Sequence, residues 1–250
     1  MKLLSLILSL TLFALVGCSS TPRHGSDVDP TRAADANAEL GLRYMLQGDY
    51  QVAMEKLERA LEFDSRHAQA HHYTAELYRR LGRPNEAERH FSRAVRFSRD
   101  PDHTLHNNYG VFLCSQGQFR KGEQQLLKVL ENPVYPQTDQ VYENLGLCME
   151  DSGDLSRAEG YLRQALSRNP RLPISLLAMA RINFEHENYL SVRAYLQRYR
   201  EVAPHTPESL WLGIRTERIL GDRNALASYA LSLERNFPDS EETRLYLESR

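Results

Sequence analysis

The sequence predicts an all-α solenoid made of about six helix-turn-helix units. Small residues recur at intervals of 33 to 36 positions, in a series formed by Gly41, Ala75, Gly110, Gly146, Ala180 and Gly213. A second series follows each of these by twelve positions: Ala53, Ala87, Gly122, Ala158, Val192 and Ala225. Turn-forming segments lie between the two series, for example QGDY at 47–50 and SGDL at 152–155. A period of this length indicates one supersecondary unit stacked many times.

The first 17 residues predict a cleaved secretory leader. Lys2 is the only charge before the apolar run Leu3–Val16. As a helix, such a run reaches roughly 21 Å at about 1.5 Å per residue, which is short of the hydrocarbon core of a bilayer at about 30 Å. A positive start, a short apolar run and a small residue at Gly17 are typical of a signal peptide. A permanent membrane span is the alternative that this length disfavours.

The segment Leu15-Val16-Gly17-Cys18 resembles the bacterial lipobox. The resemblance implies that the sulfur of Cys18 is lipidated and that Cys18 becomes the first residue of the mature chain. Ser19 follows it, in place of the Asp that commonly retains such lipoproteins at the inner membrane. We therefore expect a lipid-anchored protein of the outer membrane that faces the periplasm. Residues 18–33 are polar and contain two prolines, so they predict a flexible tether.

The six units extend over residues 34–238. In the fourth unit the first helix has an apolar stripe at i, i+3, i+4 and i+7, formed by Tyr142, Leu145, Gly146 and Met149. Gly153 breaks this helix, and Pro170 ends the next one. Small side chains let the two backbones approach each other closely. Because a lone hairpin cannot bury both of its faces, stacking on its neighbours completes the core.

This pattern resembles the tetratricopeptide repeat, which places a small residue at position 8, alanine at positions 20 and 27, and proline at position 32. The resemblance implies a right-handed superhelix. Gly122 and Val192 depart from it at position 20, and Asn183 and Thr216 replace the aromatic residue at position 11. We therefore expect less regular packing in the fifth and sixth units.

Two segments lie outside the repeat. Residues 239–250 are mostly polar, with Leu245 and Leu247 among charges, and they predict the capping helix that the end of a solenoid requires. Residues 132–136 form an insertion that contains Tyr135 and Pro136. It is either a spacer that resets the angle between the third and fourth units or a loop that contacts a partner. We favour the spacer.

The histidines and cysteines do not predict a reactive site. His67 and His71 have the i, i+4 spacing of a metal-ligand pair, but a turn is expected between them and no carboxylate motif accompanies them. We expect surface histidines and no metal. Cys114 and Cys148 fall on adjacent first helices, whose axes lie about 8–10 Å apart when packed. A disulfide is the alternative to the two unpaired thiols that we expect.

The composition excludes further classes of function. The sequence contains no GxSxG motif and no phosphate-binding loop, so we expect neither an enzyme nor a cofactor nor a small-molecule substrate. Acidic and basic residues nearly balance, with a formal net charge of −2, and no excess or cluster of Lys and Arg is apparent. Nucleic acid is therefore not an expected partner.

The first helix of the first unit is the candidate partner-binding site. In the tetratricopeptide family, positions 5, 9, 12 and 13 line a concave groove, and here they are Ala38, Leu42, Met45 and Leu46. Together with the stacking stripe, they make this helix apolar over most of its circumference, so something must cover it. Either the N-terminal segment covers it, or the register is misplaced, or a partner's helix or strand docks there. We favour docking.

Several specific segments resemble the type IV pilus biogenesis and stability lipoproteins, the PilF/PilW family. They are Asn107–Gly110, the insertion at 132–136, Val141–Leu147 and Leu210–Arg215. The resemblance implies a pilotin that binds the secretin subunit of the type IV pilus, brings it to the outer membrane and promotes its multimerisation. An adaptor for peptidoglycan enzymes or for outer-membrane protein assembly is the alternative, with the same fold and anchor but a different partner.

Overall fold

The computed structural model describes residues 29–98, 103–132 and 134–250, and these residues form thirteen helices and no strand. The helices are α1 (Pro30–Gln47), α2 (Tyr50–Phe63), α3 (Ala68–Arg80), α4 (Pro84–Phe97), α5 (His103–Ser115), α6 (Phe119–Leu130), α7 (Thr138–Asp151), α8 (Leu155–Arg168), α9 (Pro173–Glu185), α10 (Tyr189–Val202), α11 (Pro207–Leu220), α12 (Arg223–Asn236) and α13 (Glu241–Glu248). The predicted all-α class is confirmed.

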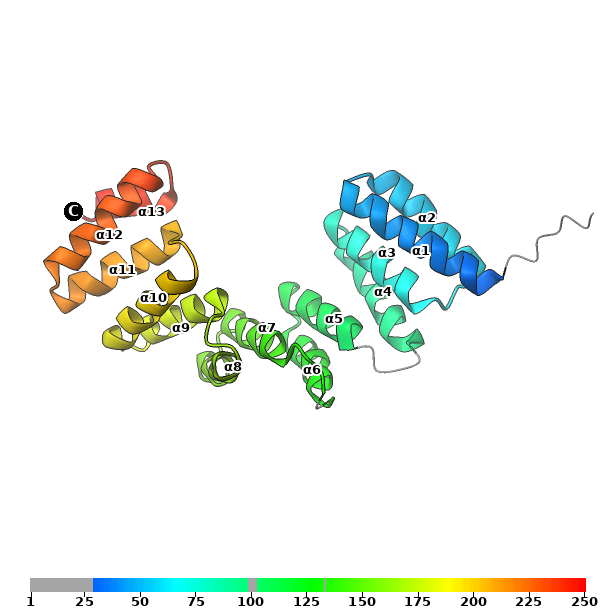
Figure 1. Cartoon of the computed structure of the whole chain (residues 1–250), viewed down its shortest axis with the longest axis horizontal. Coiled ribbons are helices and arrows are strands. Elements are labelled where there is room, and N and C mark those ends of the chain that lie inside the picture. Colours follow the sequence, from blue (N-terminus) through cyan, green and yellow to red (C-terminus); the bar gives the residue numbers. More distant parts are fainter. Residues whose placement is uncertain (1–28, 99–102, 133) are drawn as a thin grey trace, which may run out of the picture.

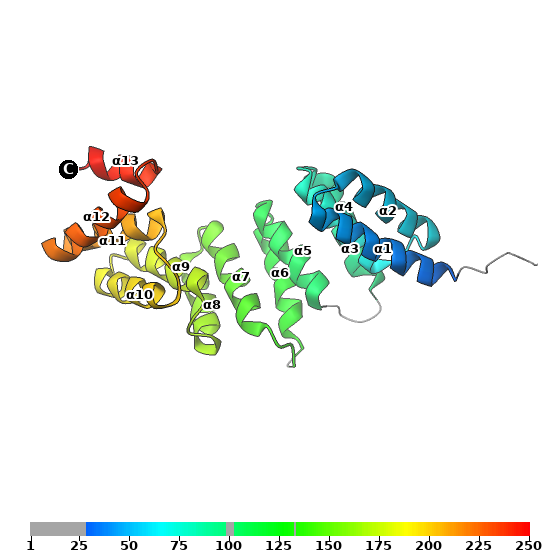
Figure 2. The same cartoon turned by 45° about the horizontal axis from the view of Figure 1, so that its top comes forward.

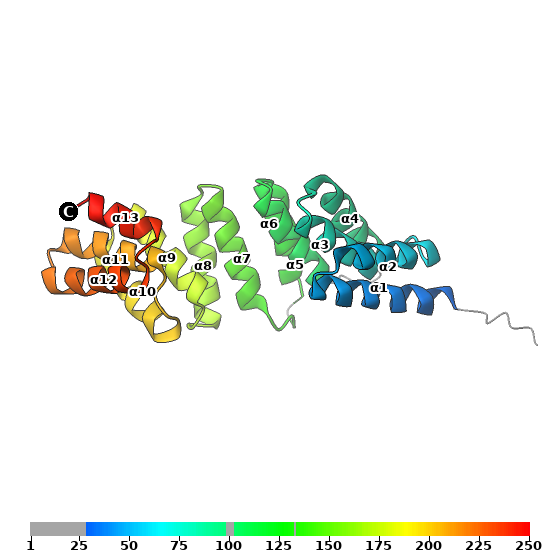
Figure 3. The same cartoon turned by 90° about the horizontal axis from the view of Figure 1, so that it is seen from above.

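Consecutive helices pair into hairpins, from α1–α2 to α11–α12, and the hairpins follow one another along a single row (Figures 1, 2 and 3). Figure 1 shows that the row is bent, so that its two ends turn toward the same side. In this view α5 and α7 lie on the concave side, whereas α6 and α8 lie on the convex side. The predicted solenoid is therefore present, with the first helix of each hairpin lining its inner surface.

The described residues contain no helix that is both long and apolar enough to cross a membrane. The leader and Cys18 lie outside the described residues. The first helix begins at Pro30, four residues before the predicted start of the repeats. Asp29 caps it by accepting a hydrogen bond from the backbone of Thr31, and proline is favoured in the first turn because its missing N–H has no partner there. Residues 30–33, which were expected to be part of the tether, are therefore helical.

The turns within the hairpins follow one local rule. Five of them contain a glycine with positive φ, and these are Gly48, Gly82, Gly117, Gly153 and Gly221. The fifth unit has Glu187 at the same place, with a φ of 59°. In three turns the residue directly after the glycine is an aspartate that caps the second helix. Asp154, for example, accepts a hydrogen bond from the backbone N–H of Arg157 at 3.1 Å. The chain therefore reverses within a few residues, and the two helices lie side by side.

The small residues at position 8 are required by the close approach of the two helices. A Cβ atom added to Gly41 would lie 2.5 Å from Cγ of Leu57 on the partner helix. The same construction at Gly146 gives 2.5 Å to Cγ of Leu162. No real Cβ contact is this short, so any larger residue would push the hairpin apart. The repeated small residue is a packing requirement of each unit.

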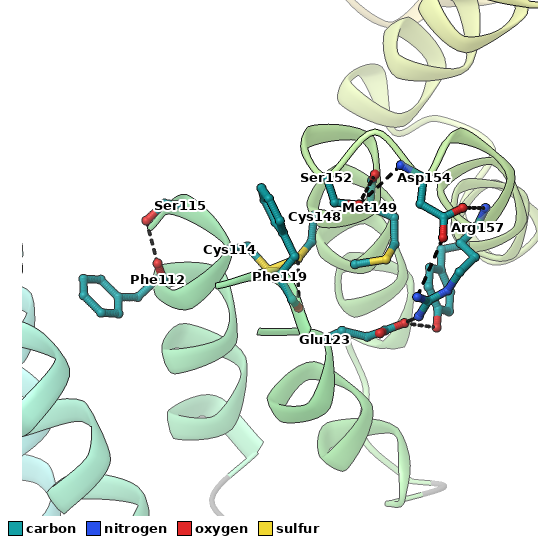
Figure 4. Close-up of a disulfide and its surroundings, with 11 residues drawn as sticks. Phe112, Cys114, Ser115, Phe119, Glu123, Cys148, Met149, Ser152, Asp154 and Arg157 are labelled. Atoms are coloured by element: carbon teal, nitrogen blue, oxygen red, sulfur yellow. Dashed lines mark hydrogen bonds and ion pairs between the residues drawn. A yellow bond between two sulfur atoms is a disulfide. The ribbon is translucent and has the colours of Figure 1, made fainter. Parts of the chain in front are cut away.

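Cys114 and Cys148 form a disulfide between α5 and α7, so the expectation of two unpaired thiols is wrong. Their Cα atoms lie 5.4 Å apart, and Figure 4 shows the two side chains pointing toward each other. Axes of packed helices are about 8–10 Å apart, but each Cα lies about 2.3 Å from its axis. Facing residues therefore have Cα atoms only about 3.5–5.5 Å apart, which a disulfide can bridge.

The disulfide also explains one departure from the repeat. Gly122 of α6 stands where an alanine is usual, and a Cβ added to it would lie 2.3 Å from Sγ of Cys114. The sulfur therefore occupies the space of the missing methyl group. Met149 and Leu145 lie in the same buried cluster, which continues along the solenoid to Leu212. The bridge joins the third and fourth units at the N-terminal end of this core cluster.

The other departures are accommodated locally. Asn183 and Thr216, which replace the aromatic residue at position 11, are buried. Each side chain donates a hydrogen bond to a backbone carbonyl of its own helix. The amide of Asn183 donates to the carbonyl of Met179 at 2.8 Å, and the hydroxyl of Thr216 donates to the carbonyl of Leu212 at 2.7 Å. Buried polar groups are tolerated when they are hydrogen-bonded in this way. The two units are therefore complete without the aromatic ring.

Helix α13 closes the C-terminal end of the row. Its buried side chains are Thr243 and Tyr246, whereas Leu247 is half exposed. Tyr246 joins a cluster with Leu210 and Ile214 of α11 and with residues of α12. The predicted segment is thus a short helix that covers the last hairpin. The ring of Tyr246 packs on that hairpin, in place of the leucines that the sequence indicated.

The insertion after α6 leaves a longer connection than the other inter-hairpin loops. Within its described residues, Tyr135 packs against the central core cluster, and its ring centroid lies 5.6 Å from that of His103 on α5. Val134 is 82% exposed. One side chain therefore anchors the loop between the third and fourth units while its neighbour faces solvent. Both the spacer and the contact loop are compatible with this arrangement.

Replacing Gly146 by valine should lower the free energy of unfolding by about 2–3 kcal/mol, because the added atoms collide with Leu162 in a filled core. Gly160→Ala is the matched control, since an added Cβ there meets nothing within 4 Å. It should leave stability unchanged or raise it by about 0.5–1 kcal/mol. Urea denaturation followed by circular dichroism measures both. Equal stability of Gly146→Val and the native chain would contradict the packing argument.

Removing the disulfide should also destabilise the fold. The bridge closes a segment of 34 residues, and restricting the unfolded chain in this way is worth about 3–4 kcal/mol in the chain-entropy model. The double variant Cys114→Ser/Cys148→Ser should therefore unfold at lower urea concentration. The native chain treated with dithiothreitol should follow the variant. Native chain that unfolds identically with and without reductant would rule the bridge out.

Candidate functional site

The concave surface of the solenoid is crossed by a chain of polar side chains. The amide of Asn108 on α5 lies 3.0 Å from Nε2 of His72 on α3, and it accepts a hydrogen bond from Asn107 at 3.3 Å. Asn144 of α7 donates in turn to Asn107 at 3.0 Å. These bonds join the second, third and fourth units through their first helices. The segments that carry the asparagines are therefore part of the contact between units.

Charged groups continue this pattern toward the C-terminus. Glu143 of α7 accepts hydrogen bonds from the backbone N–H and the hydroxyl of Ser175 on α9, at 3.0 and 2.6 Å. Arg181 of α9 donates to Glu150 of α7 at 2.7 Å and to Glu208 of α11 at 2.9 Å. The hydrogen bonds to Glu150 raise the pKa of Arg181 above its usual value. His72, Glu143 and Glu150 each bond to a residue of the next unit in this way.

The first unit differs, because its first helix carries apolar residues at the same positions. The structure divides the four predicted binding residues into two pairs. Ala38 is 1% exposed and packs with Ala60 and Ala70, and Met45 is 2% exposed within the cluster of Ala53, Leu57 and Leu77. Both α2 and α3 pack against α1, so this helix buries a wider arc than its stacking stripe alone. Ala38 and Met45 belong to the core and are not accessible to a partner.

Leu42 and Leu46 remain at the surface, and we call them the first-unit patch. Leu42 is half-buried against the core cluster, whereas Leu46 is 66% exposed. Their i, i+4 spacing places both on one face of α1. Leu190 and Leu231 are equally exposed, but they lie on the second helices α10 and α12. The first-unit patch is therefore an apolar pair on the first helix of the first unit.

Two histidines are buried, which corrects the expectation of a solvated surface. His71 is 3% and His72 is 6% exposed. Nε2 of His71 lies 3.1 Å from the carbonyl of Ser65 and donates to it, so its Nδ1 accepts from Nδ1 of His90 at 3.1 Å. Burial lowers the pKa of both His71 and His90, the latter to about 4. Neutral rings that bond to each other are structural groups.

The predicted pair His67 and His71 is not brought together as a metal site. His67 is the N-cap of α3: its Nδ1 accepts from the backbone of Ala70 at 3.0 Å, and its Nε2 lies 2.8 Å from a carboxylate oxygen of Asp35. Both ring nitrogens are thus used. Over residues 29–98, 103–132 and 134–250, no group of three or more His, Cys, Asp or Glu side chains could hold a metal ion.

Comparison with known proteins agrees with this fold. Models of the tetratricopeptide repeat match residues 44–107 and 113–173. The type IV pilus assembly protein PilF of Pseudomonas aeruginosa is 31% identical over 229 residues, which cover 90% of each chain. A protein of Haemophilus influenzae is 32% identical over 148 residues, or 59% of this chain and 82% of that one.

Solved structures give the same result. The structure of Pseudomonas aeruginosa PilF matches with a TM-score of 0.77 at 30% identity, covering 88% of this chain and 99% of that one. The crystal structure of PilW, a widely conserved type IV pilus biogenesis factor, matches with a TM-score of 0.77 at 29% identity and covers 86% and 98%. With the same repeat, the same length and the same row of hairpins, the chain belongs to the PilF/PilW family of tetratricopeptide-repeat proteins of type IV pilus biogenesis.

Proposed function

We propose that this protein is an outer-membrane lipoprotein that binds the secretin subunit of the type IV pilus, promotes its localisation in the outer membrane and helps it form multimers. The observation that carries the proposal is the similarity to a type IV pilus assembly protein over nine tenths of both chains. The surface described above supports binding to another polypeptide. We expect no catalytic activity and no cofactor.

Two features support the location. The segment LVGCSS closes the apolar run of residues 3–16 and resembles a lipobox with its cysteine at position 18. The disulfide between Cys114 and Cys148 is of a kind that persists in oxidising compartments, such as the periplasm, and is rare in the cytosol. A chain that is exported, oxidised and acylated at Cys18 would lie at the periplasmic face of a membrane. Several acyl chains on one cysteine make such an anchor stable.

The first-unit patch supports binding of the partner through an apolar contact. Burying Leu42 and Leu46 is worth at most about 1.5–3 kcal/mol for each fully exposed side chain, and Leu42 is already half-buried. Association costs about 4–15 kcal/mol in lost freedom of motion, so a single contact of this size is weak. Confinement of both proteins to one membrane, or several copies on a ring of subunits, raises the effective affinity. The lipid anchor is therefore part of the binding mechanism.

Leu46→Arg should reduce secretin capture about tenfold, because it places a charge where an apolar side chain is expected to be buried. Leu46 is exposed, so the variant keeps its fold. Leu190→Arg is the matched control, with the same change at a residue that is 69% exposed on α10, and it should capture the secretin normally. Co-purification from detergent-solubilised envelopes measures the effect. The double variant Leu42→Arg/Leu46→Arg should lose more.

Two outcomes would count against this proposal. Normal secretin capture by a folded Leu46→Arg protein would remove the first-unit patch from the interface. Recovery of a peptidoglycan enzyme or an outer-membrane assembly factor, with no secretin, would favour the alternative adaptor function. Mass spectrometry of the co-purified proteins separates the two results.

Cys18→Ser should leave secretin multimers in the inner membrane, because the variant lacks the acyl chains that carry the complex outward. Density-gradient separation of the two membranes, followed by immunoblotting, locates both proteins. Ser19→Asp provides a comparison in which the cysteine is kept and only the residue that commonly sets the membrane address is changed. It should also shift the protein to the inner membrane. If the secretin reaches the outer membrane in full amount in the Cys18→Ser strain, the carrier role is wrong.

A further inference from the structure

Helix α4 carries a cluster of arginines, although the composition predicts no basic cluster. Arg89, Arg93 and Arg96 are spaced by four and three residues, so they lie on one face of the helix, and all three are exposed. We call these three residues the arginine face. The buried side of α4 is formed by Ala87, Phe91 and Ala94. The three guanidinium groups therefore point away from the core.

No carboxylate forms an ion pair with the arginine face within the part of the chain that the structure describes. None of its members takes part in an ion pair there, although exposed arginines elsewhere commonly do, as in Arg163 with Glu159. The two glutamates of α4 are engaged with other groups. Glu86 pairs with Arg83, and Glu88 accepts a hydrogen bond from Gln118 of α6 at 2.8 Å. The face is thus a local excess of positive charge on a chain whose net charge is −2.

The arginine face borders a hollow of about 540 Å³ between α4 and α5. Its other walls are formed by Asn85, Ser92, Tyr109 and Glu88. The carboxylate of Glu88 accepts a hydrogen bond from Gln118, so the hollow combines the arginines with hydroxyl and amide groups and one hydrogen-bonded carboxylate. The ring of Tyr109 is fixed because it stacks on Phe91, with ring centroids 5.7 Å apart. Guanidinium and hydroxyl groups around a hollow are suited to phosphate oxygens, which accept several hydrogen bonds at once.

The position of the face indicates which anion it meets. A second hollow, also of about 540 Å³, is lined by Thr31 at the start of α1, by Asp64 and Arg66 in the connection between α2 and α3, and by Phe97 at the end of α4. The guanidinium groups of Arg66 and Arg96 lie 5.3 and 5.8 Å from the ring centroid of Phe97. The basic end of α4 therefore lies where the chain leaves the tether and enters the fold. In Figure 1 the start of α1 and the end of α4 both lie at the lower right of the first two units.

We propose that the arginine face binds the phosphate groups of an anionic phospholipid bilayer, and so holds the first two units against the membrane surface. From Arg89 to Arg96 the helix rises only about 10 Å, so all three charges lie within about one Debye length of a surface that touches the end of α4. An acyl anchor supplies one membrane contact, and a basic patch supplies the second that fixes orientation. The choice of a membrane as the ligand rests on the proposed anchoring at Cys18.

The test uses the chain from residue 18 onward with Cys18→Ser, which has neither leader nor acyl chains. All the packing described above lies within residues 29–250, so this chain retains its fold. It is sedimented with vesicles of phosphatidylethanolamine and phosphatidylglycerol, and with vesicles of phosphatidylcholine alone, at low and high salt. We expect binding to the anionic vesicles only, and weaker binding at high salt.

Arg89→Gln/Arg93→Gln/Arg96→Gln should weaken binding to anionic vesicles at least tenfold at low salt. The matched control is Arg200→Gln/Arg223→Gln/Arg235→Gln, which removes the same charge from exposed arginines of α10 and α12 at the other end of the row. It should bind like the parent chain. Circular dichroism confirms that both triple variants keep their helices.

Equal binding by the two triple variants would overturn the proposal, as would equal binding to neutral vesicles. Binding of inorganic phosphate or duplex DNA without any binding to anionic vesicles would also overturn it and identify another anion as the ligand. The assay contains neither acyl chains nor secretin, so it does not depend on the proposed function. Leu46→Arg introduced into the same chain should sediment with anionic vesicles normally.

Discussion

The close approach of two helices within each hairpin is the constraint on which the structure depends. Where Gly41, Gly110 and Gly146 face a leucine of the partner helix, there is no room for even one more carbon atom. The hairpins are therefore thin, and each can bury its remaining apolar face only against the next one. A row of such units has one inner and one outer surface and no central cavity. Its chemistry is consequently restricted to what its surfaces can bind.

The inner surface is mostly occupied by the protein's own contacts. Asparagines, the Glu143–Ser175 bonds and the Arg181 bridges connect successive first helices, so the polar groups that look available in isolation already have partners. The first unit has no preceding hairpin, and its first helix presents Leu42 and Leu46 instead. The end of the solenoid nearest the tether thus combines an apolar patch on α1 with a basic face on α4. On the proposals above, a membrane contact and a partner contact would both lie in the first two units.

The central disulfide shows how a departure from the repeat can have a structural cause. Gly122 looks like a weak match to the pattern until its neighbour is known to be the sulfur of Cys114. Tyr246 of α13 similarly provides the apolar cover that two nearby leucines suggested. In each case the space is filled by a residue other than the expected one: the sulfur of Cys114 from the preceding helix, and the ring of Tyr246 from between the two leucines.

Local spacing was enough to predict the helices, the turns, the hairpins and the class of fold, because these depend on residues within one 34-residue unit. The glycine turns, the aspartate caps and the small residues at position 8 act over a few positions of the chain. The disulfide, the burial of His71 and Ala38, and the hollow beside the arginine face depend on contacts between helices or units. Cys114 meets Cys148, and α3 covers α1, only when neighbouring units stack. The spacing of side chains along one helix does not contain that information, and the packed structure does.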